Sequence, residues 1–298
     1  LLAHHGLYER LWSAQQTLRT MKKLSNFVWL LAIALTATIT FTSCGKDKDD
    51  PVDKNKVKVN PAKVFVNGMP KEVAGSVFTL DAQGRVSSIV NKEEKEKATF
   101  EYKSDVLGTT DVPNVVMTVT DDDSKTVYKL LLNEAGYVKY CDEYEYEKNE
   151  IAKSKTWNLE YDSDNRLVKA VQSESGFQTT YTLTYKNGDA TESSTVSQKE
   201  GKETNHYQIF YTSSKVTSPI VNKGCIMFFG GGLGIELDDL EYAYYAGMLG
   251  KATKHLPIYN LDKDNDKISF EWTINKGGFP TKVVIKDEED VDQILFVW

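Results

Sequence analysis

Three carboxylates in the stretch 261–271 have a spacing that suggests chemistry. Asp262, Asp264 and Asp266 occupy alternate positions, which resembles the start of a calcium loop, where hard oxygen ligands converge on one ion. The pattern departs from that loop because Lys267 follows Asp266 where the loop requires a glycine. Two interpretations stay open: a calcium site formed by the three aspartates, or a solvated hairpin loop before the next strand.

A second candidate is a cluster of tyrosines late in the chain. Tyr242, Tyr244 and Tyr245 follow shortly after Phe228 and Phe229. A tyrosine ring offers a rigid apolar face with a polar tip, which suits stacking against a sugar or a peptide. The alternative is that these tyrosines pack a helix onto a sheet. The sequence therefore gives Tyr242, Tyr244 and Tyr245 as ligand-binding candidates with a structural alternative.

Residues for nucleophilic catalysis are scarce. Beyond the N-terminal 43 residues the chain has two histidines, His206 and His255, and no G-x-S-x-G nucleophile motif. The glycines of 230–234 open no strand–turn–helix unit, so they form no dinucleotide-binding motif. We assign no catalytic residue and expect no cofactor and no enzyme activity. A carboxylate-dependent hydrolase remains an alternative that would require two buried acids facing one cleft, roughly 5 to 10 Å apart.

The cysteines do not indicate zinc. Cys141 and Cys225 lie far apart, and no C-x-x-C or H-E-x-x-H motif occurs. Outside the cytoplasm they could form a disulfide or stay as two buried thiols, and the sequence leaves both open.

The N-terminal region reads as an export signal. Residues 21–23 are Met-Lys-Lys, residues 27–41 are mainly apolar, and Cys44 follows Thr-Ser. The apolar run is shorter than the roughly 20 residues that a membrane span needs. We interpret 1–20 as an upstream extension that is not translated, 21–43 as a lipoprotein signal peptide and 44–60 as a charged tether.

Cys44 resembles the lipidated cysteine of a bacterial lipobox, although phenylalanine replaces the usual leucine three positions earlier. Lipidation would anchor the mature protein to outer-membrane lipid. Residues 45–50, Gly-Lys-Asp-Lys-Asp-Asp, resemble the export signal of surface lipoproteins in the Bacteroides group. We expect the protein to face the cell exterior, with a periplasmic orientation as the alternative.

The chain carries 36 Lys+Arg against 43 Asp+Glu, a formal charge of -7. An acidic surface disfavours nucleic acid, because phosphate binding needs a basic footprint. We therefore expect no nucleic-acid partner. A monomer that binds a glycan or protein ligand fits these features.

Residues 61–298 read as one β domain with a recurring unit. Each copy has an alternating apolar strand, a turn with Asp, Asn or Gly, and a second strand. Arg85 and Arg166 occupy equivalent positions in two copies, and Asn67-Gly68 suggests a further hairpin. The copies span 78–90, 130–142 and 159–171, and more loosely 183–195, 272–284 and 209–221. These features predict an all-β fold, an antiparallel meander of hairpins curled into a barrel or strongly bent sheet.

One region departs from the strand pattern. Residues 224–259 are glycine-rich and then helix-like. They predict one short helical insertion near 236–250, which would plug or cover one end of the barrel.

The Cys44 region, the hairpins and the segment 240–259 together resemble a family of Bacteroides-group lipoproteins. That family is a domain of unknown function with a porin-like β fold, and the resemblance covers 61–298. It implies porin-like topology and brings no catalytic residues. Membrane insertion is disfavoured, because most of the predicted strands are shorter than the roughly 9 to 11 residues of a spanning strand and carry charges opposite the aromatic face. The resulting hypothesis is a lipid-anchored, non-enzymatic binding module for a glycan or peptide. The alternatives are a structural or assembly lipoprotein and the carboxylate-dependent hydrolase.

Overall fold

The computed structural model describes residues 57–298, except residues 104, 107, 110, 123, 149 and 289. The signal peptide, Cys44 and most of the tether lie outside the described residues. The first strands are β1 (Glu72–Val73), β2 (Ser76–Leu80), β3 (Val86–Asn91), β4 (Glu96–Tyr102), β5 (Val115–Thr120), β6 (Lys125–Leu132), β7 (Val138–Glu147), β8 (Glu150–Tyr161) and β9 (Leu167–Glu174). The later strands are β10 (Phe177–Lys186), β11 (Asp189–Ser197), β12 (Lys202–Phe210), β13 (Ile220–Val221), β14 (His255–Leu256), β15 (Tyr259–Leu261), β16 (Lys267–Ile274), β17 (Pro280–Lys286) and β18 (Val291–Val297). The helical turns are η1 (Pro61–Lys63), α2 (Gly230–Leu233), η2 (Asp238–Glu241) and α3 (Tyr242–Tyr245).

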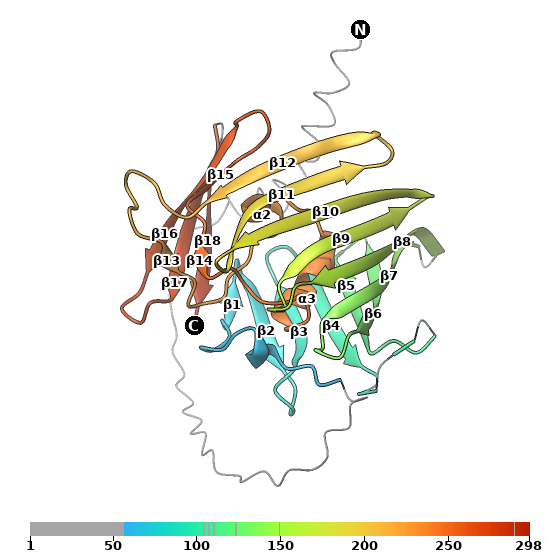
Figure 1. Ribbon diagram of the computed structural model, residues 1–298. Coiled ribbons are helices and arrows are strands. Elements are labelled where there is room, and N and C mark those ends of the chain that lie inside the picture. The colour runs from blue at the N-terminus through green and yellow to red at the C-terminus, as the bar shows by residue number, and fades with distance from the viewer. Residues whose placement is uncertain are drawn as a thin grey trace.

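Sixteen of these strands form one closed antiparallel barrel (Figure 1). Strands β2 to β12 follow chain order around the wall, and β12 then pairs with β15. Strands β15 to β18 continue the wall, and the short β1 closes it between β18 and β2. Strands β13 and β14 form a separate two-stranded sheet. The predicted meander is confirmed, and it closes into a barrel.

Side chains alternate between a dry inner face and a polar outer face. In β8, Trp157 and Leu159 are buried while Asn158 and Glu160 are exposed. In β10 the outward positions include Gln178, Thr180, Thr182 and Thr184, whereas Tyr181 and Leu183 face inward and are buried. A membrane-spanning barrel has the reverse arrangement, with an apolar outer band around a polar interior. The outer wall of these strands is therefore suited to water.

Four of the predicted repeats share one hairpin turn, and a fifth copy joins β15 to β16. In each, an Asp or Asn oxygen accepts the backbone N–H four residues later, and the fourth residue has positive φ. Glycine and asparagine tolerate that backbone conformation best. The five turns begin at Asp81, Asn133, Asp162, Asp262 and Asn275. The repeat is thus a structural unit, and its signature is an Asx residue followed by Gly or Asn three positions later.

The two equivalent arginines make the same contacts. Arg85 Nε donates to Asp81 at 2.8 Å, and Arg166 Nε donates to Asp162 at 2.7 Å. Both guanidinium groups also lie over a tyrosine ring, at 4.0 Å from its centroid for Arg85 and 4.9 Å for Arg166. They fasten the turns to the neighbouring strand.

Two of the looser copies differ. Copy 183–195 has a two-residue turn at Asn187-Gly188, both with positive φ. Copy 209–221 forms no hairpin, because β12 ends at Phe210 and irregular chain follows.

The hairpin predicted at Asn67-Gly68 is wrong. Residues 61–63 form the helical turn η1, since Pro61 suits the first helical position and Asn60 Oδ1 accepts the Ala62 N–H at 2.9 Å. Local capping thus prevailed over the hairpin signal of Asn67-Gly68 and the alternating Val64 and Val66 before it.

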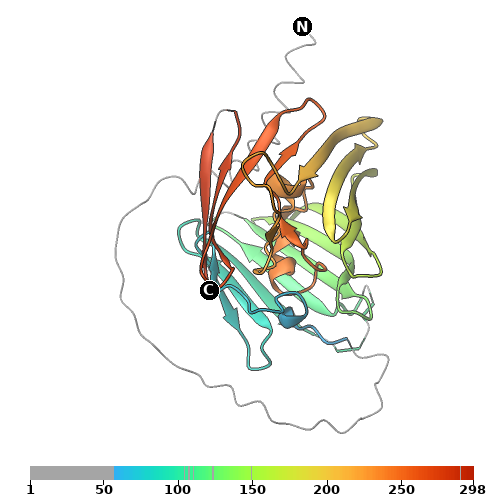
Figure 2. The same ribbon diagram turned by 60° about the vertical axis from the view of Figure 1, so that its left-hand side comes forward.

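The helix-like region lies inside the barrel. We call residues 224–258 the internal segment; its turns α2 and α3 lie within the ring of strands in Figures 1 and 2. Its helical part ends at Tyr245, because Gly247 adopts φ 77°, which a helix cannot contain. The predicted insertion near 236–250 is confirmed, though its helix is shorter than the pattern indicated. Among the described residues, none of the helices has the length and apolar character needed to cross a membrane.

Candidate functional site

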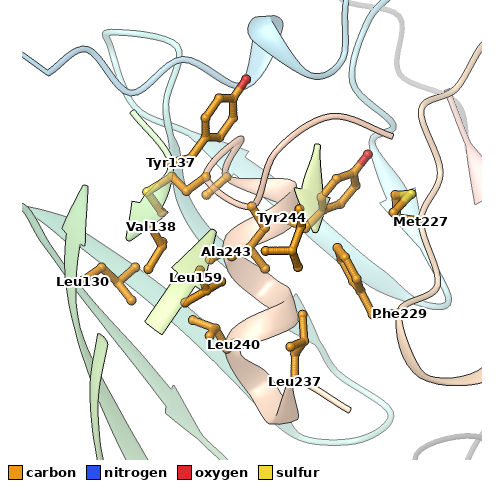
Figure 3. Close-up of a cluster of buried hydrophobic side chains, with 14 of the residues drawn as sticks. Leu130, Tyr137, Val138, Leu159, Met227, Phe229, Leu237, Leu240, Ala243 and Tyr244 are labelled. Carbon is orange, nitrogen blue, oxygen red and sulfur yellow. The ribbon is translucent and has the colours of Figure 1, made fainter. Parts of the chain in front are cut away.

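The apolar side of the internal segment is part of the barrel core. Figure 3 shows Leu240 beside Leu159 of the wall, and Tyr244 near Phe229 of the same segment, with ring centroids 5.6 Å apart. All of these side chains are buried. The segment is therefore held rigidly, and any group on its opposite side has a fixed position.

Two close contacts fix the start of this segment. Asn260 of β15 donates to the carbonyls of Gly231 and Gly232 at 2.9 and 3.1 Å. Gly234 has φ 71°, and a Cβ there would lie 2.0 Å from the Tyr207 ring. Glycine is required at this point both for the backbone conformation and for the close approach.

The polar side of the segment carries acids that meet the wall strands β7 and β8. Lys155 of β8 lies 2.7 Å from Asp238, 3.1 Å from Glu143 and 3.4 Å from Glu145. Glu143 is 1% exposed and also accepts a 2.6 Å bond from Trp157 Nε1. A charge this deeply buried is tolerated only when it is paired and hydrogen-bonded.

In this cluster the neighbouring acids keep Lys155 charged, and burial makes the acids harder to ionise. Burial opposes the charge of Lys155, yet Asp238 and Glu143 raise its pKa well above the ordinary value. Burial raises the pKa of Glu143 despite the attraction of Lys155. Burial, with Glu96 and Asp238 nearby, raises the pKa of Asp239 to about 7. Near neutral pH the Asp239 carboxyl is therefore partly protonated.

The acids face a part of the inner wall that solvent reaches. Glu236 and Asp238 are exposed, and Gln172 Nε2 lies 3.3 Å from Asp238. On β10, Phe177 and Thr179 share the inward face with buried Tyr181, and Phe177 is 51% exposed. We call Glu236, Asp238, Gln172 and Phe177, together with the Lys155 cluster that contacts Asp238, the acidic inner face. It combines carboxylates, an amide and an aromatic ring, the groups that bind polar ligands.

The three predicted tyrosines lie elsewhere on the segment and pack against the wall. Tyr244 is 1% exposed, and its hydroxyl donates to the Cys225 carbonyl at 2.6 Å. Tyr245 packs against Phe78 at a centroid distance of 5.0 Å, and the Tyr242 hydroxyl bonds to Glu96. Their geometry supports the helix-packing interpretation.

The predicted aspartate loop is the turn between β15 and β16. Asp262 Oδ1 accepts the N–H groups of Asp264 and Asp266 at 2.8 and 2.9 Å. In the described part of the chain, no group of three or more His, Cys, Asp or Glu is arranged to hold a metal ion. The geometry therefore supports a structural hairpin turn at these residues.

The remaining reactive side chains have structural contacts. His255 Nδ1 lies 2.7 Å from Asp189, and His206 Nδ1 lies 3.4 Å from Glu203. Cys141 is buried, Cys225 is partly buried, and both are free thiols, so they form no disulfide with each other.

Sequence reasoning missed the Lys155 cluster. A signal existed in the alternation, since Glu143 and Glu145 stand at the same parity as Cys141 in β7, and Lys155 at that of Trp157 in β8. That parity placed the charges on the dry face. What it could not show is that Asp238, more than 80 residues away, completes the cluster.

Comparison with known proteins agrees with the geometry. Residues 78–282 match a family model described as a domain of unknown function (DUF4595) with porin-like fold. A crystal structure of a porin-like protein from Bacteroides uniformis has a TM-score of 0.52 at 15% identity, covering 74% of this chain and 89% of that one. A porin-like protein from Bacteroides vulgatus has a TM-score of 0.49 at 9% identity, covering 77% and 98%. A search of curated proteins gave no match.

Proposed function

Because the chain belongs to the family of porin-like domains of unknown function (DUF4595), we propose that it is a non-enzymatic binding protein of the cell envelope. It binds a polar ligand, a glycan or a peptide, at the acidic inner face. Lipid on Cys44 anchors it to the outer membrane, with the barrel facing the cell exterior.

The acidic inner face is the observation that carries this proposal. Glu236 and Asp238 reach solvent, while the segment that bears them is packed into the core on its other side. Carboxylates and the Gln172 amide can accept and donate hydrogen bonds to hydroxyl or amide groups. Phe177 adds an exposed ring on which a sugar or an apolar side chain can stack. A site held on packed elements has a smaller ordering cost on binding.

A pore function fits the interior poorly. The middle of the barrel is occupied by Trp157, Tyr128, Leu130 and Tyr244, each at most 1% exposed. An aqueous channel needs a polar, water-filled interior. The similarity to porins is therefore one of topology, because the middle of this barrel is a packed core.

The anchoring proposal rests on the sequence of 21–60 and on the Bacteroides origin of the similar structures. Radiolabelled palmitate should label the full chain in a Bacteroides host and should not label Cys44→Ser. Protease treatment of intact cells should release the barrel if it faces outward. Label on Cys44→Ser, or protection from protease, would refute the anchor or the orientation respectively.

The binding proposal is tested on glycan and peptide arrays with the mature protein extracted in detergent. The double variant Asp238→Asn, Phe177→Ala should lose at least about tenfold in affinity for the best ligand. Asp111→Asn, an exposed carboxylate in the 103–114 loop, serves as the matched control and should bind normally. Thermal unfolding confirms that each variant is folded. Equal binding by the double variant would contradict the site. A stoichiometric envelope protein co-purifying without any array ligand would favour the assembly alternative.

A second candidate function is a carboxylate-dependent hydrolase, favoured by one observation. Asp239 has a pKa raised to about 7 and lies among other acids, a pattern that also marks general acids. A panel of glycoside substrates tests it: hydrolysis that falls as pH rises above 7 and disappears in Asp239→Asn would establish the enzyme. No turnover by the native chain would exclude it for those substrates.

A further inference from the structure

Strand β12 has a free edge. Its residues 208–210 pair with β15 through Gln208↔Leu261, Ile209↔Asn260 and Phe210↔Tyr259. Its residues 202–207 pair only with β11 within the described part of the chain. Figures 1 and 2 show β12 and the β15–β16 hairpin diverging beyond the paired stretch. The barrel is therefore closed by three residue pairs here, and the rest of β12 is left with one neighbour.

Backbone groups along this edge lie in the plane of the sheet and point into the gap between β12 and β15. The Phe210 carbonyl accepts the Ile258 N–H at 2.7 Å, so Phe210 faces the β15 side. Backbone groups alternate along a strand, so Gln208 and His206 face the same side. The His206 N–H is satisfied there by the Asn205 side chain at 2.9 Å, a local contact that a pairing strand could replace. An unpaired edge of this kind is a template for strand addition.

The opposite side of the gap is acidic. Asp262 and Asp266 lie in the β15–β16 turn, and both contribute to raising the pKa of Tyr207, whose first cause is burial. The β17–β18 turn lies at the same end of the sheet, because Ser269 pairs with Lys286. The two turns together contain Asp262, Asp264, Asp266, Asp287, Glu288 and Asp290. Three lysines in these turns and at their ends, Lys263, Lys267 and Lys286, offset only part of this charge, so the region is strongly negative.

We propose that residues 202–207 of β12 bind an extended, lysine- or arginine-rich peptide strand by β-strand addition. The peptide backbone pairs with the edge of β12, and its basic side chains face the acidic turns. The bulge between Thr195 and Val196, opposite 203–205, keeps the regular pairing short, so the charges supply much of the selectivity. A second copy of this chain fits less well, because the same acidic turns would meet one another and repel.

This site is separate from the acidic inner face, since it uses the backbone of the wall. The two proposals are distinguished by where the ligand binds: strand addition requires protection of 202–207 in hydrogen exchange, whereas the proposed function requires contacts at Asp238, Gln172 and Phe177.

The probe is a short fluorescein-labelled peptide of alternating lysine and valine, with an alternating glutamate–valine peptide as its control. Anisotropy at low salt should show binding of the lysine peptide alone. Asp264→Lys with Glu288→Lys should weaken it roughly tenfold, and Asp111→Lys should change it little. Equal affinity for both peptides, or no binding, would overturn the proposal.

Hydrogen exchange on the full chain locates the contact. The lysine peptide should slow exchange at 202–207, and His206→Pro should abolish binding because proline cannot donate to an added strand. A far-ultraviolet spectrum and thermal unfolding show that this variant is folded; should it unfold, the exchange result on the native chain still decides. Protection confined to other strands would refute the site. Protection at 202–207 that rises with protein concentration alone would show that a second copy occupies the edge, contrary to the proposal.

Discussion

Asp239 offers a sharp test of the electrostatics at the internal segment. Its pKa of about 7, against an ordinary 3.8, means that folding favours the protonated acid. The free-energy cost of ionising Asp239 in the folded protein is absent below about pH 4. It grows as pH rises from about 4 to 7 and is complete above pH 7. The difference corresponds to about 4 kcal/mol at pH 8. Water around this partly exposed side chain reduces that figure, so we expect about 2 to 4 kcal/mol.

The variant Asp239→Asn removes the charge and keeps the shape. It should raise the free energy of unfolding by that amount at pH 8 and change it little at pH 4. For a barrel of this size the midpoint of thermal unfolding should rise by roughly 5 to 10 °C at pH 8. Urea unfolding at both pH values measures the effect directly, with Asp111→Asn as the control that should show no pH-dependent difference.

The reasoning would be refuted in either of two ways. A loss of stability at pH 8 would mean that the Asp239 carboxylate is stabilised by its surroundings. An equal change at pH 4 and pH 8 would mean that the variant acts through packing and that charge is not the cause.

Three further predictions concern the core and the turns. Trp157→Ala should cost about 3 to 5 kcal/mol in urea unfolding, since the ring is fully buried; a cost below 1 kcal/mol would contradict a packed interior. Gly84→Ala meets no atom within 4 Å and should cost only about 1 kcal/mol for its positive φ, whereas Gly234→Ala must also displace Tyr207 and should cost clearly more; equal costs would contradict the close approach. Asp162→Ala removes the oxygen that accepts two backbone N–H groups and the carboxylate partner of Arg166, and it should cost about 2 kcal/mol in thermal unfolding; a neutral result would show that the repeated turn forms without its Asx residue.

Alternation and turn chemistry made the barrel predictable. Pairs such as Trp157 and Leu159 mark the dry face of a strand by themselves, because residues two apart point the same way. The repeated turn was visible through Asp81 and Asp162 and their equivalent arginines. Where a local signal competed with another, as at Pro61 against the alternating valines, the stronger capping signal decided the structure and the strand prediction failed.

The candidate site was less predictable, because it depends on contacts across the barrel. Lys155 and Glu143 are neighbours on adjacent strands, yet Asp238 reaches them only because the internal segment enters the barrel. Such long-range contacts leave no periodic pattern in the sequence. The length of the short helix was mispredicted although Gly247 lies just past its end, at a position where glycine commonly ends a helix.

The central claim is that a polar ligand binds at the acidic inner face. A crystal structure of the mature protein with the strongest ligand from the array screen tests it most directly. The ligand should contact Asp238 and Gln172 and lie against Phe177. A ligand seated on the outer wall, with the inner face unchanged, would contradict the account.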